Sequence, residues 1–311
     1  MTPGLAYQEI QRGAVTSWWR VLLGIGLLAA LSLVVLQLPI LLVFSVIFLA
    51  RGENVADAMS AMLDTDHLTP TGLAYLNLAL ATAIPAAILA TFLLHGWLKP
   101  GWLVSVLGRV RWGWLCACLG LAVVTLALTM LVGAVVPSSS NDPEVGGHLN
   151  AFTSTTKDFI LVVLFLTPLQ AMGEEFAFRG YLTQAIGGLF GRVAAVVVPA
   201  VLFALAHGSQ GLPVFFDRLA FGLVAGVLVI VTGGLEAGIA MHVLNNFLAY
   251  GVALAYGDMT SALNPGEGSW WDIPVTLTQS LVYLGLVWFL ARKLRIATRT
   301  PGILVGSAAA V

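Results

Sequence analysis

Long apolar runs separated by short polar segments dominate this chain of 311 residues. A bilayer core about 30 Å thick is crossed by roughly 20 apolar residues in a helix, and a helix satisfies its own backbone hydrogen bonds in lipid. The pattern therefore predicts an all-α polytopic membrane protein with about eight transmembrane helices. We expect them at Val21–Ala50, Gly72–Trp97, Trp112–Val136, Phe159 to about Gly188, Val193–His207, Leu219–Thr232, Leu235–Tyr256 and Ile273–Ala291.

The composition supports the same interpretation. Hydrophobic residues make up 59% of the chain and charged residues 9%, whereas a soluble domain is about half apolar and about a quarter charged. Membrane lipids are therefore expected to surround the protein, and the net charge of -1 argues against nucleic acid as a partner. We predict a single membrane domain over residues 1–311, with an N-terminal arm at 1–20 and a C-terminal tail at 292–311.

The charges of the polar segments alternate along the chain. The N-terminal arm, the segment around Lys99 to Arg111, Arg192 and the segment from Arg292 onward are basic, whereas the segments between them are acidic or mixed. Because basic loops stay in the cytoplasm, both termini are predicted to be cytoplasmic, which requires an even number of spans. Eight spans meet this requirement, and the expected location is a bacterial plasma membrane.

Polar residues inside the predicted spans are concentrated in residues 159–256, which we interpret as the catalytic core helices. Ionisable side chains are costly in a membrane, so each one is a candidate functional residue. They form three groups on three apolar helices: Glu174-Glu175 with Arg179, Phe203 with His207, and His242 with Asn246.

The first group contains two adjacent carboxylates with different expected roles. Adjacent helical residues point about 100° apart, so Glu174 and Glu175 cannot face the same way. Glu175 and Arg179 are four residues apart and can form an ion pair. This pairing leaves Glu174 to face a cavity, as a general base requires.

The second group reaches the same depth through a turn. The glycine-rich segment from Gly187 to Arg192 is the expected turn between the fourth and fifth spans. Glu174 and His207 each lie roughly 16 residues from its middle, about 24 Å along a helix. An antiparallel hairpin would therefore place these two side chains at a similar depth.

The third group completes a site suited to hydrolysis. His242 and Asn246 share a helix face, whereas Asn245 points about 100° away and is the weaker candidate of the two asparagines. Glu174 could activate a water molecule by taking its proton. His207 could orient that water or share the proton with Glu174. His242 and Asn246 could donate hydrogen bonds to the oxyanion that forms when water attacks a peptide carbonyl.

A metal site is the alternative chemistry. Glu174, His207 and His242 are acceptable zinc ligands, with a water in the fourth position. The H-E-x-x-H pattern of many zinc proteases is absent from this sequence. No cofactor is firmly predicted, and the sequence leaves zinc open.

With its three motifs in order, the chain resembles the CAAX prenyl protease and bacteriocin-processing (CPBP, or Abi) family of intramembrane proteases. The resemblance covers residues 173–246, about a quarter of the chain. It implies a bundle like that of the CAAX endopeptidases, with Glu174 as the base helped by His207, and His242 and Asn246 as oxyanion stabilisers. It also implies supporting roles for Glu175 and Arg179, while Phe203 is expected to pack beside the site.

The predicted function is an intramembrane endopeptidase that acts on a hydrophobic or lipidated peptide or protein. One alternative is a non-catalytic membrane immunity or scaffold protein of the same fold. A transporter that uses buried charges as an ion relay is another, but the other predicted spans are almost free of charge and no inverted repeat is evident. The substrate, the scissile bond and the oligomeric state are not predicted by the sequence.

Overall fold

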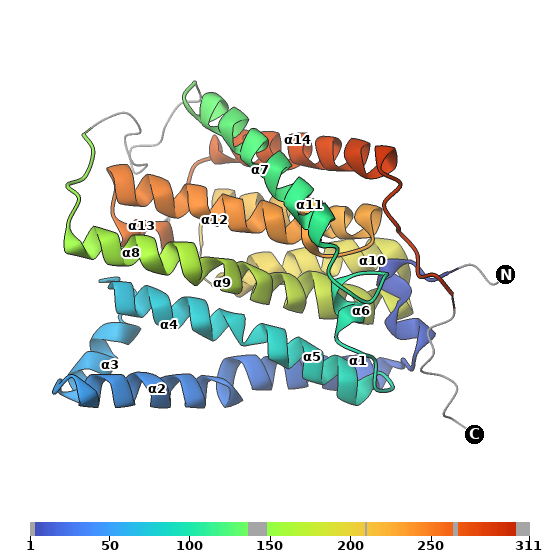
Figure 1. Ribbon diagram of the computed structural model, residues 1–311, viewed down its shortest axis with the longest axis horizontal. Helices are drawn as coiled ribbons and strands as arrows, with labels where there is room; N and C mark the ends of the chain where they lie inside the picture. Colours follow the sequence, from blue (N-terminus) through green and yellow to red (C-terminus); the bar gives the residue numbers. More distant parts are fainter. Residues whose placement is uncertain (1–3, 136–147, 209, 264–266, 303–311) are drawn as a thin grey trace.

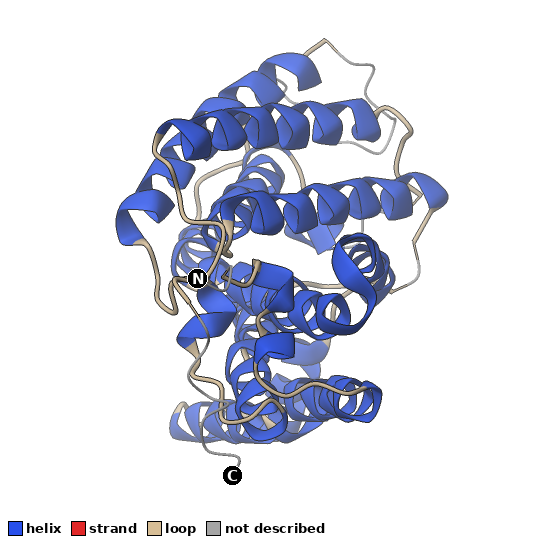
Figure 2. Cartoon of the chain, turned by 90° about the vertical axis from the view of Figure 1, so that its right-hand side faces the viewer, coloured by secondary structure: helices blue, strands red, loops and turns tan. Residues whose placement is uncertain are grey.

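The chain folds into a bundle of helices (Figure 1). The computed structural model describes residues 4–135, 148–208, 210–263 and 267–302. In those ranges the backbone forms helices and two isolated bridges, and no strand is present (Figure 2). The predicted all-α polytopic fold is confirmed.

The chain begins with two short 3-10 helices, η1 (Tyr7–Glu9) and η2 (Gln11–Gly13), before the first long helix. The remaining elements are α1 (Trp18–Ala30), η3 (Leu31–Val35), α2 (Gln37–Ala50), α3 (Val55–Leu63), α4 (Pro70–Ala81), α5 (Ala83–Leu94), α6 (Gly101–Val104), α7 (Trp112–Gly133), α8 (Ser154–Phe165), α9 (Thr167–Glu174), η4 (Glu175–Leu182), α10 (Thr183–Ala206), α11 (Leu212–Thr232), α12 (Glu236–Tyr256), α13 (Met259–Leu263) and α14 (Asp272–Lys293).

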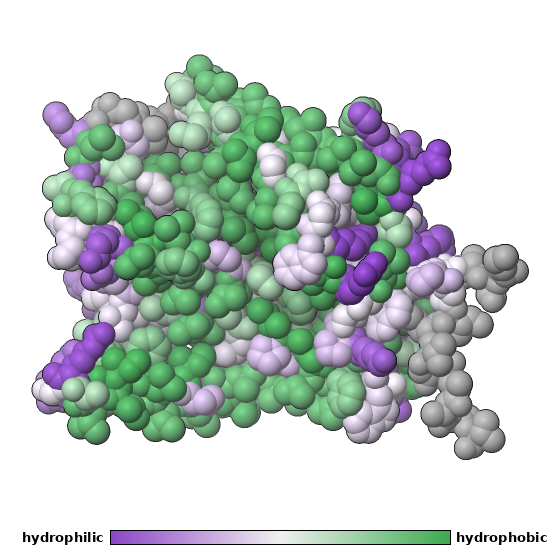
Figure 3. Space-filling view, in the orientation of Figure 1, coloured by the Kyte–Doolittle hydropathy of each residue, from purple (hydrophilic) through white to green (hydrophobic). Residues whose placement is uncertain are grey.

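Within the described part of the chain, seven continuous helices are long and apolar enough to cross a membrane. They are Trp18–Ala50, Pro70–Leu94, Trp112–Gly133, Ser154–Ala206, Leu212–Thr232, Glu236–Tyr256 and Asp272–Lys293. Apolar side chains cover the middle of the molecule, and polar ones gather toward its two ends (Figure 3). Large residues such as Leu33 and Leu42 face outward, whereas Ala86, Ala87 and Ala90 are buried, which allows the helices to pack closely.

The helix Ser154–Ala206 contains two antiparallel arms. Gly191 interrupts it with φ 80° and ψ -174°, a left-handed region that glycine adopts without a steric cost. The Thr183 hydroxyl donates to the Ala195 carbonyl across the turn, and the Phe178 and Phe203 rings lie 5.4 Å apart. The predicted turn is thus present, and the two arms correspond to the fourth and fifth predicted spans.

The first arm changes its winding at the candidate site. It passes from α8 and α9 into η4, a π-helical segment that begins at Glu175. Such segments are often found at functional sites, because the extra residue per turn reorients the side chains. The helix therefore departs from regular α geometry at the two adjacent glutamates.

The start of the sixth predicted span differs most from the structure. The sixth span was expected at Leu219–Thr232, but α11 begins at Leu212, with a proline in its first turn. Asp217 and Arg218, which precede the predicted start, therefore lie inside a helix. The last residue of the third predicted span, Val136, and residues 303–311 of the predicted C-terminal tail lie outside the described residues.

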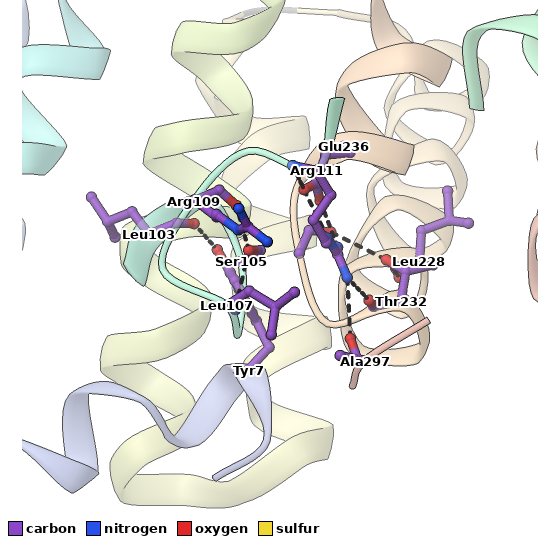
Figure 4. A network of polar contacts seen from close by, with 11 residues as sticks. Tyr7, Leu103, Ser105, Leu107, Arg109, Arg111, Leu228, Thr232, Glu236 and Ala297 are labelled. Carbon is purple, nitrogen blue, oxygen red and sulfur yellow. Dashed lines mark hydrogen bonds and ion pairs between the residues drawn. The ribbon is translucent and has the colours of Figure 1, made fainter. Parts of the chain in front are cut away.

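The end of the bundle that carries both termini is tied together by buried polar contacts (Figure 4). Arg111 donates to both carboxylate oxygens of Glu236, at 2.9 and 2.6 Å, and to the carbonyls of Thr232 and Ala297. The Tyr7 hydroxyl donates to the Leu103 carbonyl. Glu236, at the start of α12, is the buried partner of Arg111.

Candidate functional site

The two adjacent carboxylates lie at the junction of α9 and η4, and both are buried. The exposed fractions of Glu174 and Glu175 are 8% and 0%. Gln170, one turn earlier, donates to Glu174 Oε1 at 3.0 Å, whereas Arg179 donates to Glu175 Oε1 at 3.1 Å. The predicted Glu175–Arg179 pair is present, and the two glutamates have separate partners.

His242 lies between these carboxylates. This residue belongs to α12, and its Nδ1 lies 3.0 Å from Glu175 Oε1 while its Nε2 lies 3.7 Å from Glu174 Oε2. The first contact is a hydrogen bond in which Nδ1–H donates to the carboxylate, and the second is longer than a hydrogen bond. Glu175 therefore fixes the orientation of the ring and directs Nε2 toward Glu174.

A close approach of α12 to the first arm makes this contact. A Cβ added at Gly238 would lie 2.7 Å from Glu175 Oε2, so the absence of a side chain there allows the approach. On the opposite side, a Cβ at Gly173 would lie 2.3 Å from the Leu80 carbonyl oxygen, which places α9 against α4. Glycines thus set the positions of the helices on both sides of the two glutamates.

His207 directly follows Ala206, the last residue of α10, and it lines the same cavity. Its Nδ1 lies 2.8 Å from the Phe203 carbonyl oxygen, so the ring donates to its own helix and presents Nε2 on its other side. The His207 and Phe203 rings pack at 4.7 Å. The antiparallel hairpin predicted from residue spacing accounts for the common position of His207 and Glu174.

Aromatic side chains form the apolar wall of the site. Phe203 contacts His242, at 5.9 Å between ring centroids, and stacks on Phe221 at 6.0 Å. The guanidinium carbon of Arg179 lies 4.3 Å from the centroid of the Phe203 ring, a cation–π contact. Phe203 therefore packs beside the site as predicted, and it also covers the buried cation.

A cavity of about 230 Å³ brings the predicted residues together. It is lined by Gln170, Glu174, Phe203, His207, Asp217, Arg218, Phe221, His242, Asn245, Asn246, Ala249, Tyr250, Ala262, Leu263 and Thr276. Glu175 and Arg179 lie behind it, in contact with His242 and Phe203. Asn246 lines the cavity, and so does Asn245, the weaker candidate of the two asparagines.

Sequence reasoning missed five polar residues of the cavity: Gln170, Asp217, Arg218, Tyr250 and Thr276. Gln170 lies four residues before Glu174, a spacing that places both on one helix face. Asp217 and Arg218 were missed because the sixth span was taken to begin at Leu219. The proline at position 213 is a helix-start signal that could have placed them inside the helix.

The zinc alternative requires three ligands around one point. Among the residues that the structure describes, no group of three or more His, Cys, Asp or Glu side chains is placed to hold a metal ion. Nδ1 of His242 is also engaged by Glu175. Glu174, His207 and His242 therefore do not form a ready zinc site, and a zinc-dependent mechanism stays a prediction for a chelation test.

The fold and the cavity define a polytopic membrane protein with a buried carboxylate–imidazole site. Residues 156–248 match the family model described as type II CAAX prenyl endopeptidase Rce1-like. The resemblance found in the three motifs is therefore confirmed over this segment, and it supports a CAAX-type intramembrane protease.

A curated relative matches a larger share of the chain. The chain is 28% identical over 143 residues to the uncharacterized protein YyaK of Bacillus subtilis, strain 168. The match covers 42% of this chain, and it spans about half, 48%, of the relative. It therefore carries no activity or substrate to this protein.

Proposed function

We propose that this protein is an intramembrane endopeptidase in which Glu174 activates the attacking water. The observation that carries this proposal is the cavity that Glu174, His207, His242 and Asn246 line together. A nucleophilic water, its base and the donors for an oxyanion must lie within a few ångströms of one another. The family match over residues 156–248 supports peptide hydrolysis as the reaction.

The first step forms a bond between water and the substrate carbonyl. Glu174 takes a proton from the water while the water oxygen attacks the carbonyl carbon of the substrate. The carbonyl oxygen then becomes an oxyanion. His207, whose Nδ1 is fixed by the Phe203 carbonyl, can hold the same water through Nε2. In the second step the carbon–nitrogen bond breaks, and Glu174 returns the proton to the leaving amine.

His242 and Asn246 are proposed as the oxyanion donors. The side-chain amide of Asn246 donates as it stands. His242 already directs Nδ1–H to Glu175, so it can donate from Nε2 only when the ring carries both protons. Glu175 and Arg179 then act through His242, as positioning residues.

The substrate proposed is a hydrophobic or lipidated peptide or protein segment. Purified protein in detergent, incubated with a peptide library, tests this function. We expect cleavage by the wild type and by Glu53→Gln, a matched change at an exposed glutamate, but not by Glu174→Gln or His207→Ala. Cleavage that survives both site substitutions would contradict the proposal.

Two further arms separate the alternatives. Activity that persists after treatment with a chelator supports the glutamate mechanism, whereas activity that is lost and then restored by zinc supports the metal mechanism. A wild-type protein that binds peptides from the library and cleaves none would fit the non-catalytic immunity or scaffold protein instead.

A further inference from the structure

The two ends of the bundle differ in charge. The end with the termini is defined by direct contacts: Ala6 pairs with Arg299, Ser105 pairs with Gly234, and a Cβ at Gly188 would touch Arg12. Ten of the fourteen Lys and Arg residues belong to this end or to the first or last turns of helices there. They are Arg12, Arg20, Lys99, Arg109, Arg111, Arg192, Arg292, Lys293, Arg295 and Arg299.

The opposite end carries few basic residues. Its loops are also joined by direct contacts, because the Thr260 hydroxyl accepts from Leu68 N and the Asn150 side chain donates to the Gly257 carbonyl. Among the described residues of this end, only Arg51 and Lys157 are basic, and eight residues are acidic. The acidic residues are Glu53, Asp57, Asp64, Asp66, Asp158, Asp258, Glu267 and Asp272.

This asymmetry sets an orientation in the membrane. Lys and Arg residues in short loops favour the cytoplasmic side, and Asp and Glu contribute little to that choice. Ten basic residues at one end against two at the other therefore place the basic end in the cytoplasm. The acidic end then faces the outside of the cell.

The cavity extends toward the acidic end. Thr276 lines it and lies four residues, or about 6 Å, from the first residue of α14 at that end. Ala262 and Leu263 of α13, a helix of the same end, line it as well. At the basic end, by contrast, the contacts of Arg111 with Glu236, Thr232 and Ala297 join the connecting segments (Figure 4).

A short helix arm makes room for this opening. The second arm of the hairpin runs from Arg192 to Ala206, about 15 residues, which is roughly 22 Å of helix against a hydrocarbon core of about 30 Å. It starts beside the basic end, so it stops short of the opposite surface. His207 and the cavity lie where this arm ends.

We propose that the catalytic cavity is reached from the extracytoplasmic face. The substrate is then a segment of a membrane-anchored or exported protein presented outside the cytoplasm, and not a lipidated tail that stays in the cytoplasm. The statement about the substrate rests on the proposed function. The side of the membrane to which the cavity opens can be measured without any activity.

Cysteine labelling in intact cells tests the opening. Cys116 and Cys118 are first replaced, and single cysteines are then placed at Glu53, Ala249 and Arg192, all of which are exposed. Ala249 lines the cavity and has no assigned role in the reaction. A small, charged methanethiosulfonate reagent that does not cross membranes is added before and after permeabilisation.

We expect Glu53→Cys and Ala249→Cys to react in intact cells, and Arg192→Cys to react only after permeabilisation. The reverse pattern would overturn the orientation. If Glu53→Cys is labelled in intact cells but Ala249→Cys is labelled only after permeabilisation, the proposal that the cavity opens to the outside is overturned. Hydrolysis is tested separately in detergent, where both faces are accessible, so a protein that labels as expected but cleaves nothing would fail only the proposed function.

Discussion

Replacing Glu175 with glutamine removes one charge from a buried pair while keeping the shape of the side chain. The partner cation, Arg179, is 1% exposed, and Glu175 Oε1 accepts hydrogen bonds from both Arg179 and His242. Breaking a buried ion pair by removing one partner costs about 3–5 kcal/mol, because the remaining charge stays buried without compensation. We expect Glu175→Gln to lower the free energy of unfolding by about this amount.

The Glu175→Gln/Arg179→Met double variant separates stability from positioning. Replacing both partners of a buried pair with uncharged groups is often close to neutral for stability, so most of the free energy of unfolding should return. Cleavage should not return, because the His242 ring loses the carboxylate that orients it. A displacement of about 1 Å in a catalytic group can reduce the rate by about a hundredfold.

The assay combines unfolding in mixed detergent micelles with kcat measured below the unfolding transition. Glu236→Gln is the matched control, since it breaks the buried pair with Arg111 at the other end of the bundle and leaves the cavity intact. It should lose stability but keep kcat. A loss below about 1 kcal/mol for Glu175→Gln, or a fully active double variant, would refute the reasoning.

Three other predictions follow from single positions. Gly173→Ala should lower the free energy of unfolding by about 1–3 kcal/mol, because the added Cβ would clash with the Leu80 carbonyl. Gly120→Ala should raise it by about 0.5–1 kcal/mol, because no described atom lies within 4 Å of an added Cβ there. Equal effects of the two changes in an unfolding titration would contradict this prediction. Burial lowers the pKa of His95, which follows the last residue of its span. His95 therefore binds a proton less readily in the folded state than in the unfolded state. Its contribution to the free energy of unfolding is fully present above a pH of about 6.5 and should be lost as the pH falls through the lower pKa of the folded state. His95→Gln should reduce this slope in a melting series, and an unchanged slope would exclude His95 as its source. Asn246→Ala should lower kcat by about 10²–10³, as loss of an oxyanion donor does, with little change in melting temperature; an unchanged kcat would remove it from the site.

The fold could be predicted from the sequence because lipid imposes one simple rule on every span. Apolar runs of sufficient length form helices, and the glycine-rich turn around Gly191 divides the longest of them into two arms. The boundary at α11 failed because the charges of Asp217 and Arg218 resemble those of a loop. Inside this helix they line a cavity, which a pattern of apolar residues does not record.

The polar residues of the site could be predicted individually, but their contacts could not. The spacing of Glu175 and Arg179 predicts their ion pair, because both lie on one helix. The hydrogen bond from His242 to Glu175 joins two helices and depends on their rotation and on the glycine at position 238. Likewise, both Asn245 and Asn246 line the cavity, which their 100° separation on an ideal helix does not by itself predict.

The central claim is that Glu174 serves as the base of a hydrolytic site. Its most direct measurement is kcat of the purified protein on a cleaved peptide for wild type, Glu174→Gln and the exposed control Glu53→Gln. General base catalysis contributes about 10²–10⁴-fold, so Glu174→Gln should lose at least a hundredfold while Glu53→Gln keeps the wild-type rate. A Glu174→Gln variant that is folded and cleaves at the wild-type rate would contradict the claim.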